Sequence, residues 1–423
     1  MGLGMRTVRG NVFLIVCIMG FLAILSSTMS KSGVLQYFAG YLKTPDVWLG
    51  LVYSASTIPG ILISLPAGSL SDILGRRKML LISGVIFATA PFLYLTINVW
   101  WQLALVRFYH GFATGMFVPV AQALIAEAYP SRRGERISLF SSVTAIGRSV
   151  APLIGGSILV LTNPSLLPKD YTNFSGVYLA VGFAGLSALV TALPFLREPK
   201  DAPNANYAGR VTFRNVVSGW VRIARTRGVL VVSLVEAGQY YTYGTVESFF
   251  VTYMTYVANM NGVFQSIILF SLVFTVMLSK PLVGKLSDRA GRRKPIILGC
   301  VVSAVPLVAV PFFTQFPVLL VLSMIYGLGF STVTSVTPAL VSELVPIEVV
   351  GGAMGFISTL MDIGQTLGPI VSGFILGTIV FGFTLGTFLG YVCVFSSLAL
   401  VLLLTVAAFA RFKFSEAPVG DKT

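Results

Sequence analysis

The tract G-S-L-S-D-I-L-G-R-R-K, Gly68 to Lys78, returns 216 residues later as G-K-L-S-D-R-A-G-R-R-K, Gly284 to Lys294. Eight of the eleven positions are identical, and each tract lies between two long apolar segments. The same offset relates Glu127 to Glu343, so the repeat extends beyond one loop. A charged motif that recurs at a fixed distance in an apolar chain indicates duplication of a whole membrane bundle.

The composition of the 423-residue chain is that of an integral membrane protein, with 55% hydrophobic and 10% charged residues. A helix needs about 20 apolar residues to cross ~30 Å of hydrocarbon. Short alternating strands typical of a β-barrel are lacking. We therefore expect an all-α membrane fold of 12 transmembrane helices in two pseudo-symmetric six-helix bundles. The expected helices lie near residues 11–37, 46–67, 79–97, 101–126, 137–162, 177–196, 229–256, 262–283, 295–314, 317–341, 353–379 and 383–410.

The repeat also predicts how the chain is divided. We expect an N-terminal bundle over residues 1–196, a linker over 197–228, a C-terminal bundle over 229–412 and a tail over 413–423. The linker is basic and amphipathic. It is either an anchor on the membrane surface or a solvated tether between the bundles.

The distribution of lysine and arginine predicts the orientation. With the N-terminus inside, 23 of the 29 fall in inner segments, whereas the outer loops hold only Lys43 and Lys169. The positive-inside rule then makes both termini and the linker cytoplasmic, and we expect a multi-pass protein of the plasma membrane. We interpret the net charge of +14 as this bias and as attraction to anionic lipid of the bilayer, not as nucleic-acid binding.

The duplicated tract resembles the signature between the second and third helices of the major facilitator superfamily, and the resemblance covers essentially the whole chain. In that family the cluster latches the two bundles together in the outward-open state. Its glycines would let helices approach closely, and its arginines would hold the loop at the anionic leaflet. The alternative is that the tracts only determine topology. The resemblance implies a gating role for Gly68, Asp72, Arg76, Gly284, Asp288 and Arg292.

Two further elements are similar to motifs of this family. Residues 107–111, R-F-Y-H-G, resemble its R-x-x-x-G element. Residues 147–156 resemble the G-x-x-x-G-P-x-x-G-G antiporter motif, with Ala151 in place of one glycine, and residues 364–373 carry a related pattern. The motif is associated with exporters, and its closest group is the 12-helix drug/proton antiporters. Small-residue helices of this kind also occur simply for tight packing.

Ionisable residues at membrane depth are costly, about 2.5–3.5 kcal/mol on insertion scales, and are therefore functional candidates. None lies in segments 79–97, 177–196, 295–314 or 383–410, which correspond to the lipid-facing supports of the family. The candidates are Lys31, Arg107, His110, Arg148, Glu236, Glu247, Lys280 and Asp362.

The cationic candidates dominate the first half, so we expect this half to hold an anionic or polar group of the substrate. Arg107 and Arg148 are the predicted contacts. Residues Gln239, Tyr240 and Tyr243 follow a single polar stripe of segment 229–256, and we expect them to line the same site. For Arg148 the alternative is a structural ion pair with the acid of segment 353–379.

All three membrane-embedded acids are in the second half, where we expect one of them to carry a coupled proton. Burial favours the neutral form of a carboxyl group, which suits this task. Glu236 and Asp362 are the candidates, and His110 is a third. A hydrogen-bonded structural role is the alternative for this histidine.

Lys31 and Glu247 are mates at the 216-residue offset, towards the outer ends of segments 11–37 and 229–256. Opposite charges at equivalent positions would face one another across the pseudo-twofold axis. We therefore expect them to form an outer gate. The alternatives are that each serves the substrate, or that each extends to the outer interface without a partner.

We expect a secondary active transporter that moves a small organic solute by alternating access, through proton-coupled efflux. The alternative is proton-coupled uptake of an organic anion or other small metabolite, because Lys31 stands where exporters of cationic drugs often carry an acid. The sequence shows no P-loop, metal-ligand cluster or nucleophile triad. We expect a monomer with no enzymatic activity, cofactor or metal, whose partners are a small-molecule substrate, protons and lipid.

Overall fold

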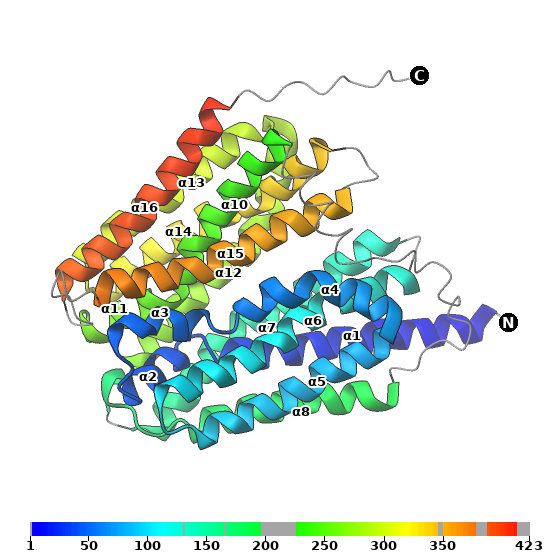
Figure 1. Ribbon diagram of the computed structural model, residues 1–423, viewed down its shortest axis with the longest axis horizontal. Helices are drawn as coiled ribbons and strands as arrows, with labels where there is room; N and C mark the ends of the chain where they lie inside the picture. Colours follow the sequence, from blue (N-terminus) through cyan, green and yellow to red (C-terminus); the bar gives the residue numbers. More distant parts are fainter. Residues whose placement is uncertain are drawn as a thin grey trace.

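The computed structural model describes residues 2–129, 132–164, 166–195, 226–345, 350–377 and 387–412. Each regular element in these ranges is helical, and the helices form two bundles (Figure 1). The first bundle comprises α1 (Gly2–Met29), α2 (Val34–Tyr41), α3 (Asp46–Ser54), α4 (Ile58–Leu74), α5 (Arg76–Leu93), η1 (Tyr94–Thr96), α6 (Trp100–Ala128), α7 (Arg133–Thr162), η3 (Pro168–Asp170) and α8 (Ser175–Phe195). The second comprises α10 (Arg227–Thr245), η4 (Val246–Phe250), α11 (Val251–Tyr256), α12 (Gly262–Ala290), α13 (Arg293–Ala309), η5 (Val310–Phe312), α14 (Phe316–Glu343), α15 (Val350–Gly377) and α16 (Phe388–Arg411).

The prediction of an all-α membrane fold in two bundles is confirmed. Among the described residues, eleven helices are long and apolar enough to cross a membrane. Segment 227–256 is not one of them, although α10, η4 and α11 make it helical throughout. Its stripe of glutamate, glutamine and tyrosine lowers its hydropathy. The linker expected over 197–228 falls almost entirely outside the described residues, and the tail over 413–423 does so completely.

The second glycine of each duplicated tract ends a helix. Gly75 follows α4 with φ 92°, and Gly291 follows α12 with φ 79°. This left-handed region is disfavoured for residues with a Cβ, so glycine is the usual residue just beyond a helix. The expectation that the tract glycines bring helices close together is wrong at Gly284, because no atom lies within 4 Å of where its Cβ would be.

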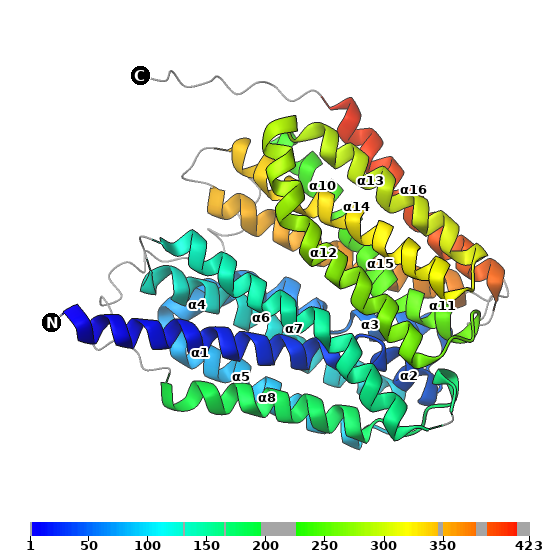
Figure 2. The same cartoon turned by 180° about the vertical axis from the view of Figure 1, so that it is seen from behind.

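In the part of the chain that the structure describes, the two bundles pack against each other at one end only (Figures 1 and 2). At this closed end, one cluster of buried apolar side chains contains residues of both bundles, such as Phe38 of α2 and Phe250 of η4. Towards the opposite end, where α1 begins and α16 ends, the core is divided. One cluster surrounds Phe117 in the first bundle, and another surrounds Phe409 in the second. We refer to this opposite end as the terminal end.

Glycines allow the backbones of the two bundles to touch at the closed end. A Cβ on Gly50 of α3 would lie 2.0 Å from the carbonyl oxygen of Pro369 in α15. On the other side of the interface, a Cβ on Gly156 of α7 would overlap Ser266 of α12. Helices α3 and α15, and likewise α7 and α12, therefore meet at a spacing that only small residues permit.

Gly50→Ala should weaken the closed end, because the added methyl group meets backbone that cannot rotate away. Overpacking of this kind costs about 1–3 kcal/mol. We expect faster labelling by a membrane-impermeant maleimide of a cysteine introduced at Val47, beside this contact. Gly284→Ala is the matched control, since its methyl group would enter open space. Equal labelling of the two variants would contradict the tight contact.

Candidate functional site

The first helix of each bundle is interrupted at equivalent positions. Lys31 lies in the turn that separates α1 from α2, and Gly33 in the same turn has φ 83°. In the second bundle the π-helical segment η4 separates α10 from α11 and carries Glu247. Irregular backbone at membrane depth is tolerated where it lines a cavity or is covered by protein, and π-helical turns are frequent at functional sites. The two breaks therefore mark a candidate site at the centre of the interface.

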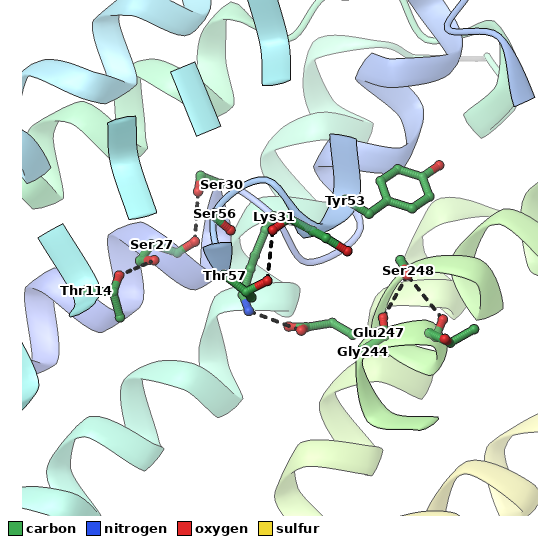
Figure 3. A network of polar contacts seen from close by, with 12 residues as sticks. Ser27, Ser30, Lys31, Tyr53, Ser56, Thr57, Thr114, Gly244, Glu247 and Ser248 are labelled. Atoms are coloured by element: carbon green, nitrogen blue, oxygen red, sulfur yellow. Dashed lines mark hydrogen bonds and ion pairs between the residues drawn. The ribbon is translucent and has the colours of Figure 1, made fainter. Parts of the chain in front are cut away.

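The structure brings the predicted gate residues together. Lys31 Nζ lies 3.1 Å from Glu247 Oε2, and the two side chains are 25% and 17% exposed (Figure 3). Gln36 of α2 donates a further hydrogen bond, 3.2 Å long, to the backbone oxygen of Glu247. Both contacts join the first bundle to the second. The pair is flanked by other polar contacts between the bundles, including Tyr37 Oη to Gln265 Oε1 at 2.7 Å.

Arg107 of α6 is held by the backbone of the first bundle. Its guanidinium donates to the carbonyl oxygen of Val52 at 3.1 Å, to that of Tyr53 at 3.4 Å and to Ser56 Oγ at 2.6 Å. These acceptors lie at the break between α3 and α4, where carbonyl groups lack helical partners. The side chain is 2% exposed. The geometry favours a structural role for Arg107, in place of the predicted contact with the substrate.

His110 is enclosed in the first bundle. Its ring packs against Phe87 and Tyr94, with Nδ1 3.4 Å from the Tyr94 hydroxyl. It is 3% exposed, and its Nε2 is buried without a partner among the described residues. The alternative of a structural histidine fits this environment better than proton transfer.

Arg148 of α7 differs from Arg107 in its exposure and in its contacts. Its side chain is exposed in the part of the interface that faces α12. Within the described ranges its guanidinium makes neither a hydrogen bond nor an ion pair, and the alternative of a structural pair with Asp362 is not formed. An unpaired arginine in a membrane helix is a strong candidate for a ligand contact.

The two candidate proton carriers lie on different helices. Glu236 of α10 is 4% exposed and accepts a hydrogen bond from the Thr337 hydroxyl of α14. Asp362 of α15 is half-buried, and its carboxylate has no ion-pair partner among the described residues. In the described ranges neither acid forms an ion pair with a lysine or an arginine.

The predicted polar stripe of segment 229–256 divides between two surroundings. Gln239 is fully buried and donates to the Cys300 sulfur of α13 at 3.5 Å, so it faces the inside of its own bundle. Tyr243 stacks on Phe330 at 4.7 Å between ring centroids, and Tyr240 packs edge-on against the same ring. The two tyrosines remain candidates for the site, whereas the position of Gln239 argues against a substrate contact.

Both duplicated tracts form the same network, each within its own bundle. Arg76 pairs with Glu127 at 2.7 Å, and Arg292 pairs with Glu343 at 2.8 Å and with Asp288. The hydrogen bond to Glu343 raises the pKa of Arg292. Sequence reasoning missed the two glutamates as partners, although the shared offset was the signal that could have found them. The side chain of Asp72 and the surroundings of Gly68 lie outside what the structure describes.

Two repeated bundles around a central charged site define a membrane transporter. The model of the Major Facilitator Superfamily matches residues 16–280 and 273–422. The chain therefore belongs to this family, and it is a transporter and not an enzyme.

Curated relatives include efflux proteins at low identity. A multi-drug resistance efflux pump PmrA homolog of Lactococcus lactis subsp. lactis is 24% identical over 336 residues, 78% of each chain. The multidrug resistance protein MdtG of Citrobacter koseri is 26% identical over 334 residues, again 78% of each chain. Both relatives carry the names of multidrug efflux or resistance proteins, which agrees with the resemblance of the motifs to those of exporters.

Solved structures with the same fold include two transporters. A bacterial homolog of the human lysosomal transporter Spinster, in an inward-facing and unoccupied conformation, has a TM-score of 0.79 at 15% identity and covers 97% of this chain and 99% of its own. The nucleoside transporter NupG has a TM-score of 0.73 at 16% identity, covering 95% of this chain and 100% of its own. At these identities the likeness shows the fold alone.

The two arginines should respond differently to the same substitution. Arg107→Gln should lower the stability of the fold by about 2 kcal/mol, because charged hydrogen bonds to buried carbonyl groups are lost. Arg148→Gln removes no intramolecular contact and should leave stability unchanged. Thermal unfolding of the purified variants in the same detergent checks this. A loss for Arg148→Gln as large as that for Arg107→Gln would contradict the assignment.

Proposed function

We propose that this transporter is a proton-coupled exporter of a small organic solute, acting as a monomer in the plasma membrane. Both termini and the linker are cytoplasmic, as the lysine and arginine distribution predicts. In this orientation the closed end is extracellular and the terminal end faces the cytoplasm. The observation that carries the proposal is the ion pair between Lys31 and Glu247, which joins the bundles at that one end.

The arrangement of ionic contacts supports alternating access. At the closed end, charged partners come from different bundles. At the terminal end, Arg76 and Arg292 are each paired inside their own bundle. In the proposed cycle Arg76 and Arg292 exchange these contacts for contacts between bundles when the terminal end closes, and Asp72 and Asp288 take part in the new contacts. The pair of Lys31 and Glu247 separates at the same time.

Asp362 and Glu236 support the assignment of a coupled proton. An acid that exchanges protons must be near the central site and free of a permanent cation. The second condition holds for both acids, because among the described residues neither Asp362 of α15 nor Glu236 of α10 forms an ion pair, and the neighbour of Glu236 is a hydroxyl. Binding of the solute from the cytoplasm and of protons from outside would then use the same interface in turn.

Proton-coupled uptake of an organic anion is the second candidate. The cations Lys31 and Arg148 favour it, since both line the central interface. Inside-out and right-side-out vesicles with an imposed pH gradient separate the two directions. Export predicts that solute accumulates in inside-out vesicles with an acidic lumen and that its entry dissipates the gradient. Accumulation in right-side-out vesicles from an acidic medium would instead establish uptake.

Without the coupling acid, the pH gradient should no longer drive solute accumulation. Asp362→Asn or Glu236→Gln should abolish accumulation driven by the gradient while sparing exchange of labelled for unlabelled solute. The expected reason is that the neutral amide keeps the shape of the site and removes the proton. Ser342→Ala on α14 is the control for expression and folding. Full gradient dependence in both single variants and in the double variant would eliminate these acids.

The proposed gate should tolerate reversal of its charges but not loss of one. Lys31→Glu and Glu247→Lys should each reduce initial transport rates at least tenfold, because like charges repel and the closed end no longer seals. The double variant restores opposite charges and should recover much of the rate. The measurement is initial solute flux in proteoliposomes at equal protein density. Single variants with wild-type rates, or a double variant no better than the singles, would leave the gate unsupported.

A further inference from the structure

Two small hollows adjoin the Lys31–Glu247 pair and share Glu247 as a lining residue. The charged side chains that line them are unbalanced. Lys31, Arg107 and Arg148 contribute three cations, and Glu247 contributes the one acid. Since Lys31 already holds that acid at 3.1 Å, the other two cations have no acid in contact with them among the described residues.

The hollow beside Arg148 is rich in hydrogen-bond donors. Thr28 and Ser32, which flank the end of α1, line it and are 4% and 5% exposed. Neither hydroxyl has a partner among the described residues, and the Tyr243 hydroxyl in the same wall has none either. Because these hydroxyl groups line the hollow without an internal partner in the described ranges, a ligand in the hollow can accept hydrogen bonds from them. Together with the unpaired guanidinium of Arg148, the three hydroxyl groups form a set of hydrogen-bond donors that suits a negatively charged acceptor.

The rest of this wall is apolar. Leu269, Leu272 and Val273 of α12 line the same hollow, and the Tyr243 ring is stacked on Phe330. An inorganic ion would gain nothing from these surfaces. A molecule with a carboxylate at one end and an apolar or aromatic body would satisfy both parts of the wall.

We propose that the hollow lined by Thr28, Ser32, Arg148 and Tyr243 binds the carboxylate of the transported solute, an amphipathic organic acid, and that this bound charge competes with Glu247 for Lys31. This assignment rests on the transport function proposed above and specifies its substrate class. Because Glu247 lines the same hollow, a carboxylate on Arg148 repels it and attracts Lys31. Binding then loosens the closed end, which is the movement that export requires.

Competition between the solute and Glu247 has a reciprocal consequence. If the bound carboxylate weakens the gate pair, loss of the pair must strengthen carboxylate binding by the same factor. Glu247→Gln should therefore raise affinity for an organic acid several-fold.

The test is direct binding to the purified full-length protein by isothermal titration calorimetry. The probes are benzoate, 2-naphthoate and octanoate, each beside its neutral primary amide. At least one acid should bind tenfold or more tightly than its amide. Arg148→Gln should abolish this preference, Arg148→Lys should reduce it, and Ser32→Ala should weaken the acid alone. Arg411→Gln, an exposed arginine in the last turn of α16, is the matched control and should change nothing.

Equal affinity of every acid and its amide, or an undiminished preference in Arg148→Gln, would overturn the carboxylate site. Unchanged acid affinity in Glu247→Gln would overturn the competition with the gate. Failure of the transport proposal is recognised separately. In that case the acid binds in an Arg148-dependent manner, but no flux of it follows a pH gradient in proteoliposomes. If a pH gradient instead drives flux of organic cations and acids are not preferred, the transport proposal stands and the carboxylate site is wrong.

Discussion

We propose that the ion pair between Lys31 and Glu247 is the contact on which the arrangement of the two bundles depends. Both residues lie in interruptions of the first helix of their bundle, where the backbone departs from the regular helix. Opposite charges attract strongly in surroundings of low dielectric constant, and each is costly alone at membrane depth. Separation of the bundles at this end therefore requires that something else stabilise both charges. Water, a proton or a bound solute can do so, which makes the pair sensitive to occupancy of the site.

The duplication accounts for the contacts that the two halves share. The positions at which the halves differ account for the charges of the central site. Both halves pair the tract arginine with a glutamate 51 positions further on, Glu127 in one and Glu343 in the other. The central residues differ between halves. Lys31 corresponds to Glu247 by the repeat, and such a charge difference is what allows two equivalent positions to attract one another.

Much of the fold followed from the sequence, because length and apolarity of a segment suffice to place a membrane helix. The repeat offset also brought Lys31 and Glu247 into register, since equivalent positions of two repeats meet near their axis. Other side chains depend on neighbours that periodicity does not specify. The stripe of segment 229–256 indicated a polar face, but Gln239 turns to α13 while Tyr243 meets Phe330. Arg107 binds carbonyl groups that lack helical partners at the break between α3 and α4. The residue pattern of α6 does not predict this contact, because the acceptors belong to other helices.

The most direct test of the central claim is a pair of distances measured by pulsed electron paramagnetic resonance in wild type and Glu247→Gln, with the native cysteines replaced. Labels at Lys169 and Gln315 report on the closed end, and labels at Ser138 and Lys285 report on the terminal end. If the ion pair sets the balance of states, its loss should lengthen the first distance and shorten the second together. An unchanged first distance, or a longer one without any change at the terminal end, would contradict the account.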